Sequence, residues 1–185
     1  YTDIVMVTLG TGVGGGVIID EKIIAGKHGL AGEIGHIHVR DEETEHCNCG
    51  GVGCLEQVAS ATGIAREARR KMKATDTPSA LRKFGDDVTA KDVLDEAKNG
   101  DDLALEVVET VGRYLGLVLA QLAMTVDPQM FVIGGGVSKA GQFLIDVIDK
   151  YYRHYTPISE NKAVIGLAKL GNDAGIYGAA RLVLD

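Results

Sequence analysis

The chain has 185 residues, of which 45% are hydrophobic, and a formal net charge of −7. This length suffices for one domain with a sizeable core, and the acidic balance argues against an extended nucleic-acid-binding surface. No apolar run is long enough to span a membrane, and the first residues are typical of a strand instead of a signal peptide. Because the chain enters this strand directly, without an initiator methionine, we expect it to be part of a longer protein.

The first third of the chain predicts strands and loops. Alternation and β-branched residues indicate short strands at residues 4–9, 17–19 and 22–25. The first of these is apolar enough for a strand buried on both faces, and the turn at 20–21 indicates a hairpin or meander. Residues 26–56 are loop-rich, and we expect one short strand within them at 37–39.

The rest of the chain alternates helices with strands. Apolar residues at spacings of three and four predict a long helix at 101–125, and Thr89 with Asp92 resembles a capping box. The expected helices cover residues 55–72, 89–98, 101–125, 138–152 (capped by Ser138) and 173–184. A polar connector is expected at 75–87, and strands at 130–133 and 163–166. This order predicts an α/β fold with a mixed sheet.

All three cysteines lie within eight residues, as Cys47, Cys49 and Cys54, with histidines at 36, 38 and 46. Three thiolates and one imidazole would complete a four-coordinate structural zinc site. The alternatives are a disulfide, which leaves one thiol over, or three free thiols in a reducing compartment. The spacing differs from that of a zinc ribbon, and few cysteines with a thiolate metal site favour a cytoplasmic protein.

The fourth ligand remains open from spacing alone. His46 is adjacent to Cys47, which makes a tetrahedral arrangement awkward. His36 and His38 would share one face of the short strand, and either could reach the metal.

Glu33 and Glu56 flank this cluster in a stretch dense with glycine and apolar groups. A carboxylate in such surroundings needs hydrogen-bond partners, because otherwise its pKa rises and it becomes neutral. Sugar hydroxyls would provide such partners. The structural alternative is that Glu56 caps the helix beginning near Leu55, or that one of the two pairs with a nearby lysine.

Two glycine-rich loops have the composition of phosphate-binding turns. Residues 10–16 contain Thr11, whose hydroxyl could donate alongside backbone N–H groups, but they match neither a Walker A loop nor the dinucleotide fingerprint. Residues 134–136 lie between a strand and a helix, where a ring or a phosphate could approach the backbone. Each loop could also be only a tight turn, but together they indicate the two lips of a nucleotide cleft.

Several of these motifs, taken in order, resemble the ROK family, which contains repressors, open reading frames of unknown role and sugar kinases. The resemblance is greatest to bacterial ROK glucokinases of the Gram-positive type. It covers nearly the whole chain and rests on residues 9–16, 28–36, 47–56, 127–138 and 172–180.

The resemblance implies the large lobe of an actin/Hsp70/hexokinase-like (ribonuclease H-like) fold. It implies that residues 1–185 form the C-terminal large lobe alone. The family's first phosphate loop, and the Asn-Asp motif whose aspartate is the catalytic base, have no match in this chain, so no catalytic residue is expected here.

The resemblance also implies individual roles. It assigns zinc to His36, Cys47, Cys49 and Cys54, which selects His36 as the fourth ligand. It assigns sugar contacts to Glu33, His36 and Glu56. It assigns the nucleotide, ATP with Mg²⁺, to Gly10, Thr11, Gly12, Gly135 and Gly136. The resemblance also implies a homodimer, because ROK glucokinases usually associate through the large lobe.

The implied reaction is transfer of the ATP γ-phosphoryl to the 6-hydroxyl of glucose or a related hexose. The main alternative is the effector-binding domain of a ROK transcriptional repressor, which would bind sugar without chemistry. A zinc-knotted structural module ranks last, because it leaves both glutamates and both glycine loops without a role.

Overall fold

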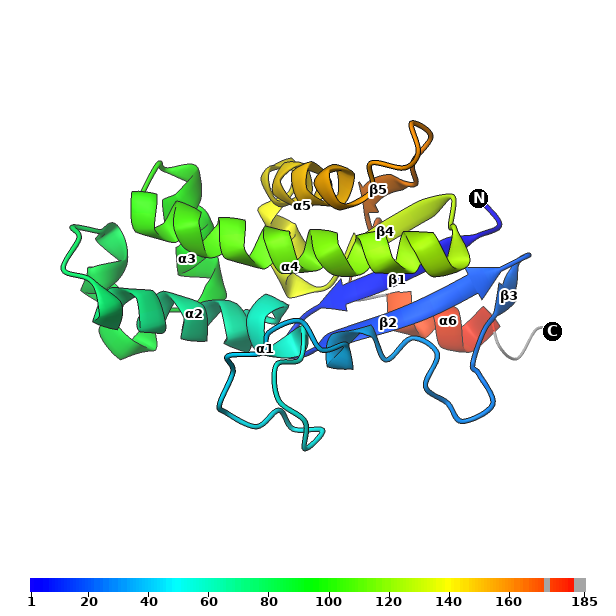
Figure 1. Cartoon of the computed structure of the whole chain (residues 1–185), viewed down its shortest axis with the longest axis horizontal. Helices are drawn as coiled ribbons and strands as arrows, with labels where there is room; N and C mark the ends of the chain where they lie inside the picture. Colours follow the sequence, from blue (N-terminus) through cyan, green and yellow to red (C-terminus); the bar gives the residue numbers. More distant parts are fainter. Residues whose placement is uncertain (172–173, 182–185) are drawn as a thin grey trace.

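The computed structural model describes residues 1–171 and 174–181 of the chain. In this part, one five-stranded mixed sheet has the strand order β3-β2-β1-β4-β5 (Figure 1). The strands are β1 (Ile4–Leu9), β2 (Val13–Ile19), β3 (Lys22–Ile23), β4 (Met130–Gly134) and β5 (Val164–Leu167). The first three form an antiparallel meander, and β4 and β5 run parallel to β1. The predicted α/β class with a mixed sheet is therefore confirmed.

The long helix α4 lies at the centre of a group of helices. Their bounds are α1 (Glu56–Ala59), α2 (Ala61–Ala74), α3 (Ala90–Lys98), α4 (Asp102–Val126), α5 (Gln142–Tyr155) and α6 (Ala174–Arg181). Short 3₁₀ helices cover Ile34–His36, Ala80–Asp87 and Gly136–Ala140. Helix α4 contacts α1, α2, α3 and α5, and Figure 1 shows α4 and α5 side by side over the sheet. In the described ranges no helix is long and apolar enough to cross a membrane.

Strand β1 differs from the expected strand buried on both faces. Val5, Val7 and Leu9 are fully buried, but Ile4 and Met6 are only half-buried and Thr8 is exposed. Helices therefore cover one face of this strand much more completely than the other. On the covered face, Phe131 of β4 packs edge-to-face against Tyr152 of α5, with ring centroids 5.6 Å apart.

Several expected elements are confirmed within a residue or two. Helix α4 occupies Asp102–Val126, and β4 and β5 fall at the predicted strands. At α3, the Thr89 side chain accepts from the Asp92 backbone N–H while the Asp92 side chain accepts from the Thr89 backbone N–H. The capping box is therefore present as predicted, and it fixes where α3 begins.

The helix expected at 55–72 is interrupted. Ser60 has extended backbone angles (φ −72°, ψ 164°), so it ends α1 and caps α2 by accepting a hydrogen bond from the Gly63 N–H. The apolar pattern runs unbroken across this position and does not reveal the break.

Three other expectations are corrected. Residues 37–39 form no strand: only an isolated bridge joins His38 to Cys54. Ser138 does not cap a helix, because its hydroxyl donates to the Gly135 carbonyl inside a 3₁₀ turn and α5 begins at Gln142. The connector at 75–87 contains the 3₁₀ helix Ala80–Asp87. The ends of the helix predicted at 173–184 lie outside the described residues.

Candidate functional site

The two glycine loops meet at one end of the sheet. Strands β1 and β4 are parallel neighbours, so the loops that follow their carboxyl ends lie side by side. A cleft of about 600 Å³ opens there, and α3 forms its opposite wall. Its lining includes Gly10, Thr11, Gly136, Lys139, Lys91 and Leu94.

Gly135 is half-buried and packs closely against Leu9 of β1, and it does not line that cleft. Its φ is +85°, and a Cβ there would lie 2.3 Å from the Leu9 carbonyl oxygen. Glycine is therefore required at this position for the second loop to approach the first. The structure thus places Gly10, Thr11 and Gly136 on the cleft and Gly135 directly behind it.

Hydrogen bonds within the turn and from neighbouring segments hold the turn between β1 and β2 in place. Within the turn, the Gly10 N–H donates to the Gly12 carbonyl (2.9 Å). From the helices, the Ala61 N–H donates to the Gly10 carbonyl (2.8 Å) and the Thr62 hydroxyl donates to the Thr11 carbonyl (3.3 Å). The Val13 N–H donates to the Glu56 carboxylate (2.9 Å). We call residues 10–13 the phosphate hairpin.

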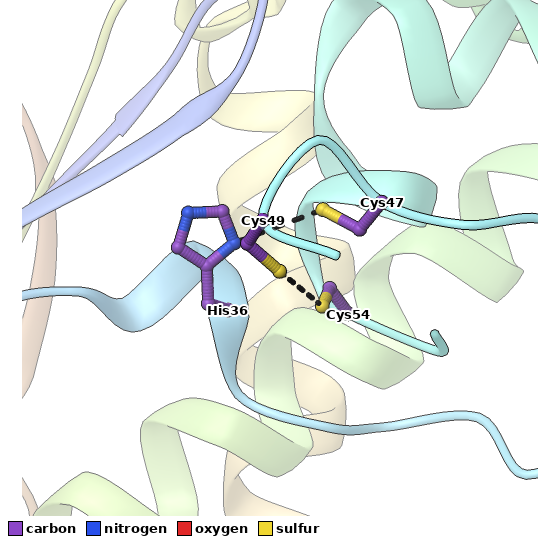
Figure 2. A group of neighbouring side chains, drawn as sticks. All are labelled: His36, Cys47, Cys49 and Cys54. Atoms are coloured by element: carbon purple, nitrogen blue, oxygen red, sulfur yellow. Dashed lines mark hydrogen bonds between the residues drawn. The ribbon is translucent and has the colours of Figure 1, made fainter. Parts of the chain in front are cut away.

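His36 and the three cysteines converge on one point (Figure 2). Their nitrogen and sulfur ligand atoms all lie within 4.8 Å of one another. Cys49 Sγ is 3.6 Å from Cys54 Sγ, and Cys47 Sγ is 3.7 Å from His36 Nδ1. Ligand atoms around a tetrahedral zinc ion lie about 3.3–3.8 Å apart. These residues therefore fit a zinc ion, and occupancy by zinc stays a prediction.

The other two candidate histidines are engaged elsewhere. His38 Nδ1 bonds the Val52 carbonyl (2.9 Å), and its Nε2 bonds the Asp41 carboxylate (2.8 Å), which raises the pKa of His38. His46 Nδ1 lies 3.2 Å from the Gly50 carbonyl. Of the three histidines left open by the spacing, only His36 joins the cysteine cluster.

The thiols of the cluster differ in acidity. Burial raises the pKa of Cys54 to about 12, and hydrogen bonds with the neighbouring thiols of Cys49 and Cys47 add to the shift. Hydrogen bonds lower the pKa of the exposed Cys49 thiol; the bond from the Gly51 backbone N–H has the largest effect and the bond from the Cys54 thiol the next largest. A bound dication would favour the thiolate form at every sulfur, because only deprotonated cysteine binds metal.

The three predicted sugar contacts lie in a row along the cluster. Glu33 Oε2 is 3.8 Å from His36 Nε2, and its side chain is 57% exposed. Cys47 follows His36, and its Sγ is 3.8 Å from Glu56 Oε1. Because Nδ1 of His36 faces the sulfurs, its Nε2 points toward the exposed side, where it could donate to a ligand. The lysine pairing that was the alternative for these glutamates does not occur among the described residues.

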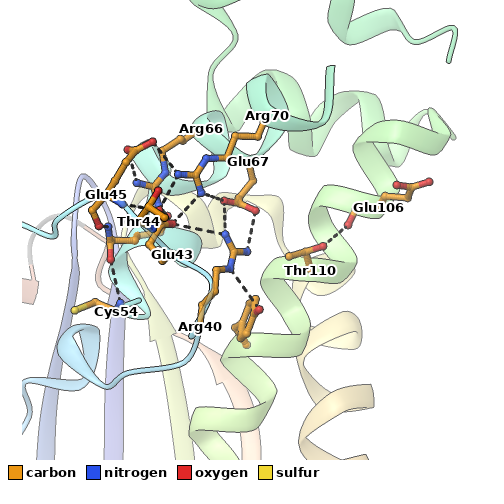
Figure 3. A network of polar contacts seen from close by, with 12 residues as sticks. Arg40, Glu43, Thr44, Glu45, Cys54, Arg66, Glu67, Arg70, Glu106 and Thr110 are labelled. Atoms are coloured by element: carbon orange, nitrogen blue, oxygen red, sulfur yellow. Dashed lines mark hydrogen bonds and ion pairs between the residues drawn. The ribbon is translucent and has the colours of Figure 1, made fainter. Parts of the chain in front are cut away.

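An ionic cluster that the sequence does not reveal holds the loop before Cys47 onto α2 (Figure 3). The Glu43 side chain is 1% exposed and accepts two hydrogen bonds from Arg70 (2.8 and 2.9 Å) and one from Arg66 (3.1 Å). Arg40 pairs with both oxygens of Glu67 (2.8 and 2.9 Å). The hydrogen bonds from Arg70, with backbone N–H donors and Arg66 adding to them, lower the pKa of Glu43 to about 2.

Gln57 connects this ionic cluster to the cysteines. Its side-chain oxygen accepts from the Cys54 N–H (3.1 Å), and its side-chain nitrogen donates to the Glu45 carbonyl (2.9 Å). Its own carbonyl accepts from Arg66 (2.7 Å). The only sequence signal for this arrangement was a pair of arginines one helical turn apart on α2, which is more often a solvated face.

Comparison with known proteins agrees with this geometry. The sequence profile described as "ROK family" matches residues 1–185. A glucokinase of Halalkalibacterium halodurans is 46% identical over 185 residues, which cover 98% of this chain and 56% of that protein. The chain thus spans a little over half the length of this relative.

Structures of ROK family proteins also superimpose on this chain. The crystal structure of a ROK family glucokinase from Streptomyces griseus, in complex with glucose and AMPPNP, superimposes with a TM-score of 0.87 at 37% identity. The match covers 98% of this chain and 60% of that one. A ROK family transcriptional regulator, a homologue of the E. coli MLC protein, has a TM-score of 0.77 at 30% identity, over 90% of this chain and 42% of that one.

Proposed function

On the premise that this chain belongs to the ROK family and has its hexokinase-like fold, we propose that it is the C-terminal large lobe of a sugar kinase. The complete protein then transfers the γ-phosphoryl of ATP, bound with Mg²⁺, to the 6-hydroxyl of glucose or a related hexose. The observation that carries this proposal is the cleft at which Gly10, Thr11 and Gly136 meet. Sugar binding alone would not need a second, glycine-lined cleft.

Each group of residues has a distinct task in this proposal. The phosphate hairpin and Gly136 hold the nucleotide, because the backbone N–H groups of Thr11, Gly12 and Gly136 and the Thr11 hydroxyl can donate to phosphate oxygens. Glu33, His36 and Glu56 bind and orient the hexose. None of these residues acts as the base, which we assign to a part of the protein outside residues 1–185. Catalysis here is mainly positioning and charge neutralisation.

Zinc on His36, Cys47, Cys49 and Cys54 has a structural role in this proposal. The four ligand atoms meet closely enough for one ion. A metal on His36 Nδ1 leaves the proton on Nε2, which can then donate to a sugar hydroxyl. The metal also ties the segment from His36 to Cys54 into one unit, because metal binding and local folding are coupled.

The test is to titrate the full-length protein separately with glucose and with AMPPNP, and then to assay phosphorylation of glucose, mannose and N-acetylated hexosamines. A kinase binds both ligands and turns over at least one sugar. A protein that binds sugar but no nucleotide would refute the proposal and favour the repressor alternative. We further propose a cytoplasmic homodimer.

A further inference from the structure

Glu56 touches two regions that carry different parts of the proposed function. Its Oε2 accepts a hydrogen bond from the Val13 N–H (2.9 Å), and its Oε1 lies 3.8 Å from Cys47 Sγ. Val13 closes the phosphate hairpin, and Cys47 belongs to the metal cluster. One carboxylate therefore spans from the metal cluster to the hairpin.

The position of Glu56 is fixed from the metal side. It lies two residues after Cys54, at the start of α1. The Cys54 N–H donates to the Gln57 side chain (3.1 Å), and the Gln57 N–H donates to the Cys54 carbonyl (3.0 Å). A change in the backbone of Cys54 would therefore be passed directly to Glu56.

The hairpin in turn depends on Glu56. Val13 pairs with Leu9 at the end of the β1–β2 ladder, and only the turn lies beyond this pair. The carboxylate sits so close to the turn that a Cβ on Gly12 would lie 2.4 Å from Glu56 Oε2. A charge-assisted hydrogen bond to a backbone N–H is among the stronger hydrogen bonds in proteins. Its loss would loosen the Val13 end of the hairpin, which then depends on the bonds from Ala61 to Gly10 and from Thr62 to Thr11.

We propose that Glu56 is a positioning residue that transmits the state of the metal cluster to the nucleotide site. The metal-bound loop holds the carboxylate, and the carboxylate holds the Val13 N–H. Together with the bonds from Ala61 and Thr62, this bond sets the shape of residues 10–12. Loss of metal then weakens nucleotide binding, although none of the four metal ligands lines the cleft described above. This inference rests on the proposed roles of the hairpin in nucleotide binding and of the cluster in metal binding.

The experiment measures AMPPNP affinity of the full-length protein without sugar, so that any sugar contact of Glu56 does not contribute. Glu56→Gln keeps the size of the side chain but exchanges a charged acceptor for a neutral one. We expect AMPPNP binding to weaken by up to about five- to tenfold, because the free-energy difference between a charge-assisted and a neutral hydrogen bond limits the effect. Zinc content stays at the wild-type level, and hydrogen exchange at the Val13 amide accelerates.

Glu33→Gln is the matched control. Glu33 is the other predicted sugar-binding carboxylate beside the cluster, but its side chain is largely exposed and approaches His36 instead of the hairpin. This variant keeps the wild-type affinity for AMPPNP and the wild-type exchange rate at Val13. If Glu56→Gln does not fold, Glu56→Asp, which keeps the charge and withdraws it by one methylene, gives the same comparison.

Removal of metal with a chelator provides the second arm. We expect faster exchange at Val13 and weaker AMPPNP binding in the wild-type protein, and a smaller further change in Glu56→Gln. Unchanged exchange at Val13 after chelation, or equal AMPPNP affinity of Glu56→Gln and Glu33→Gln, would overturn the inference. If the wild-type protein binds no nucleotide, the proposed function fails instead, and exchange at Val13 still decides whether Glu56 links the two regions.

Discussion

Glu43 provides the clearest energetic prediction, because its carboxylate is almost fully buried among arginines. Its side chain is 1% exposed, and it accepts hydrogen bonds from Arg70, Arg66 and the backbone N–H groups of Thr44 and Glu45. Replacing it with glutamine leaves the arginines in place and removes the charge that compensates them. We expect Glu43→Gln to destabilise the domain strongly.

The magnitude follows from the acidity of the carboxyl group. Its pKa falls from the ordinary 4.5 to about 2 in the folded chain. Because one pKa unit corresponds to ~1.36 kcal/mol, ionisation of this carboxyl group adds about 3 kcal/mol to the free energy of unfolding. Removing one partner of a buried ion pair costs a similar amount, about 3–5 kcal/mol. A loss of about 3 kcal/mol lowers the melting temperature by roughly 6–12 °C in a domain of this size.

The dependence on pH tests the cause. A lowered folded-state pKa adds stability that is fully present above pH 4.5 and is lost as the pH falls through the folded pKa near 2. The difference in unfolding free energy between wild type and Glu43→Gln should therefore be largest above pH 5 and shrink toward pH 2. Urea unfolding of both proteins at several pH values measures it, and groups that titrate in both proteins cancel.

Glu45→Gln is the control, because Glu45 pairs with the same Arg66 and Arg70 but is 58% exposed. Exposed pairs contribute little to stability, so this variant should lose much less. Equal losses in the two variants, or a difference between wild type and Glu43→Gln that does not vary from pH 7 to pH 3, would refute the reasoning.

Three further predictions concern the metal, the nucleotide and assembly. Cys54→Ser should abolish stoichiometric zinc binding and accelerate hydrogen exchange in residues 28–56. Elemental analysis of protein purified without added metal measures the zinc, and a variant that retains zinc would contradict the proposed ligand set. Thr11→Ala should raise KM for ATP and lower kcat while KM for sugar changes little, since Thr11 lines the cleft. About tenfold is expected for one lost hydrogen bond to a charged group. Light scattering should give a dimer mass for the full-length protein, and a monomer at high concentration would contradict the expected homodimer.

The sequence alone predicted the features that depend on a local pattern of residue types. Periodicity located α4, and residue types at fixed spacing located the capping box of α3. Clustering of cysteines located the segment that the structure folds into one group of candidate metal ligands. In each case the residues that interact are close in sequence or repeat with a short period.

The ionic cluster could not be predicted, because its partners are far apart in sequence. Glu43 and Arg70 are separated by 27 positions, as are Arg40 and Glu67. In a chain with 45 charged residues, most such residues form a solvated surface, and nothing in the sequence distinguishes the buried ones. Only the packing of the loop before Cys47 against α2 selects these pairs.

The break at Ser60 shows why a continuous apolar pattern was misleading. In an unbroken helix the Ala61 N–H would donate to the Gln57 carbonyl, four residues earlier. Instead, Ala61 donates to the Gly10 carbonyl of the phosphate hairpin, and the Gln57 carbonyl accepts from Arg66. The break therefore removes the helical hydrogen bonds of three N–H groups, those of residues 61–63. The bonds from Ala61 to Gly10 and from Arg66 to Gln57 offset part of this loss, and the Ser60 hydroxyl caps the new helix by accepting from the Gly63 N–H. The same interruption attaches the hairpin on one side and the ionic cluster on the other, so it is a requirement of the site that local helix propensity does not encode.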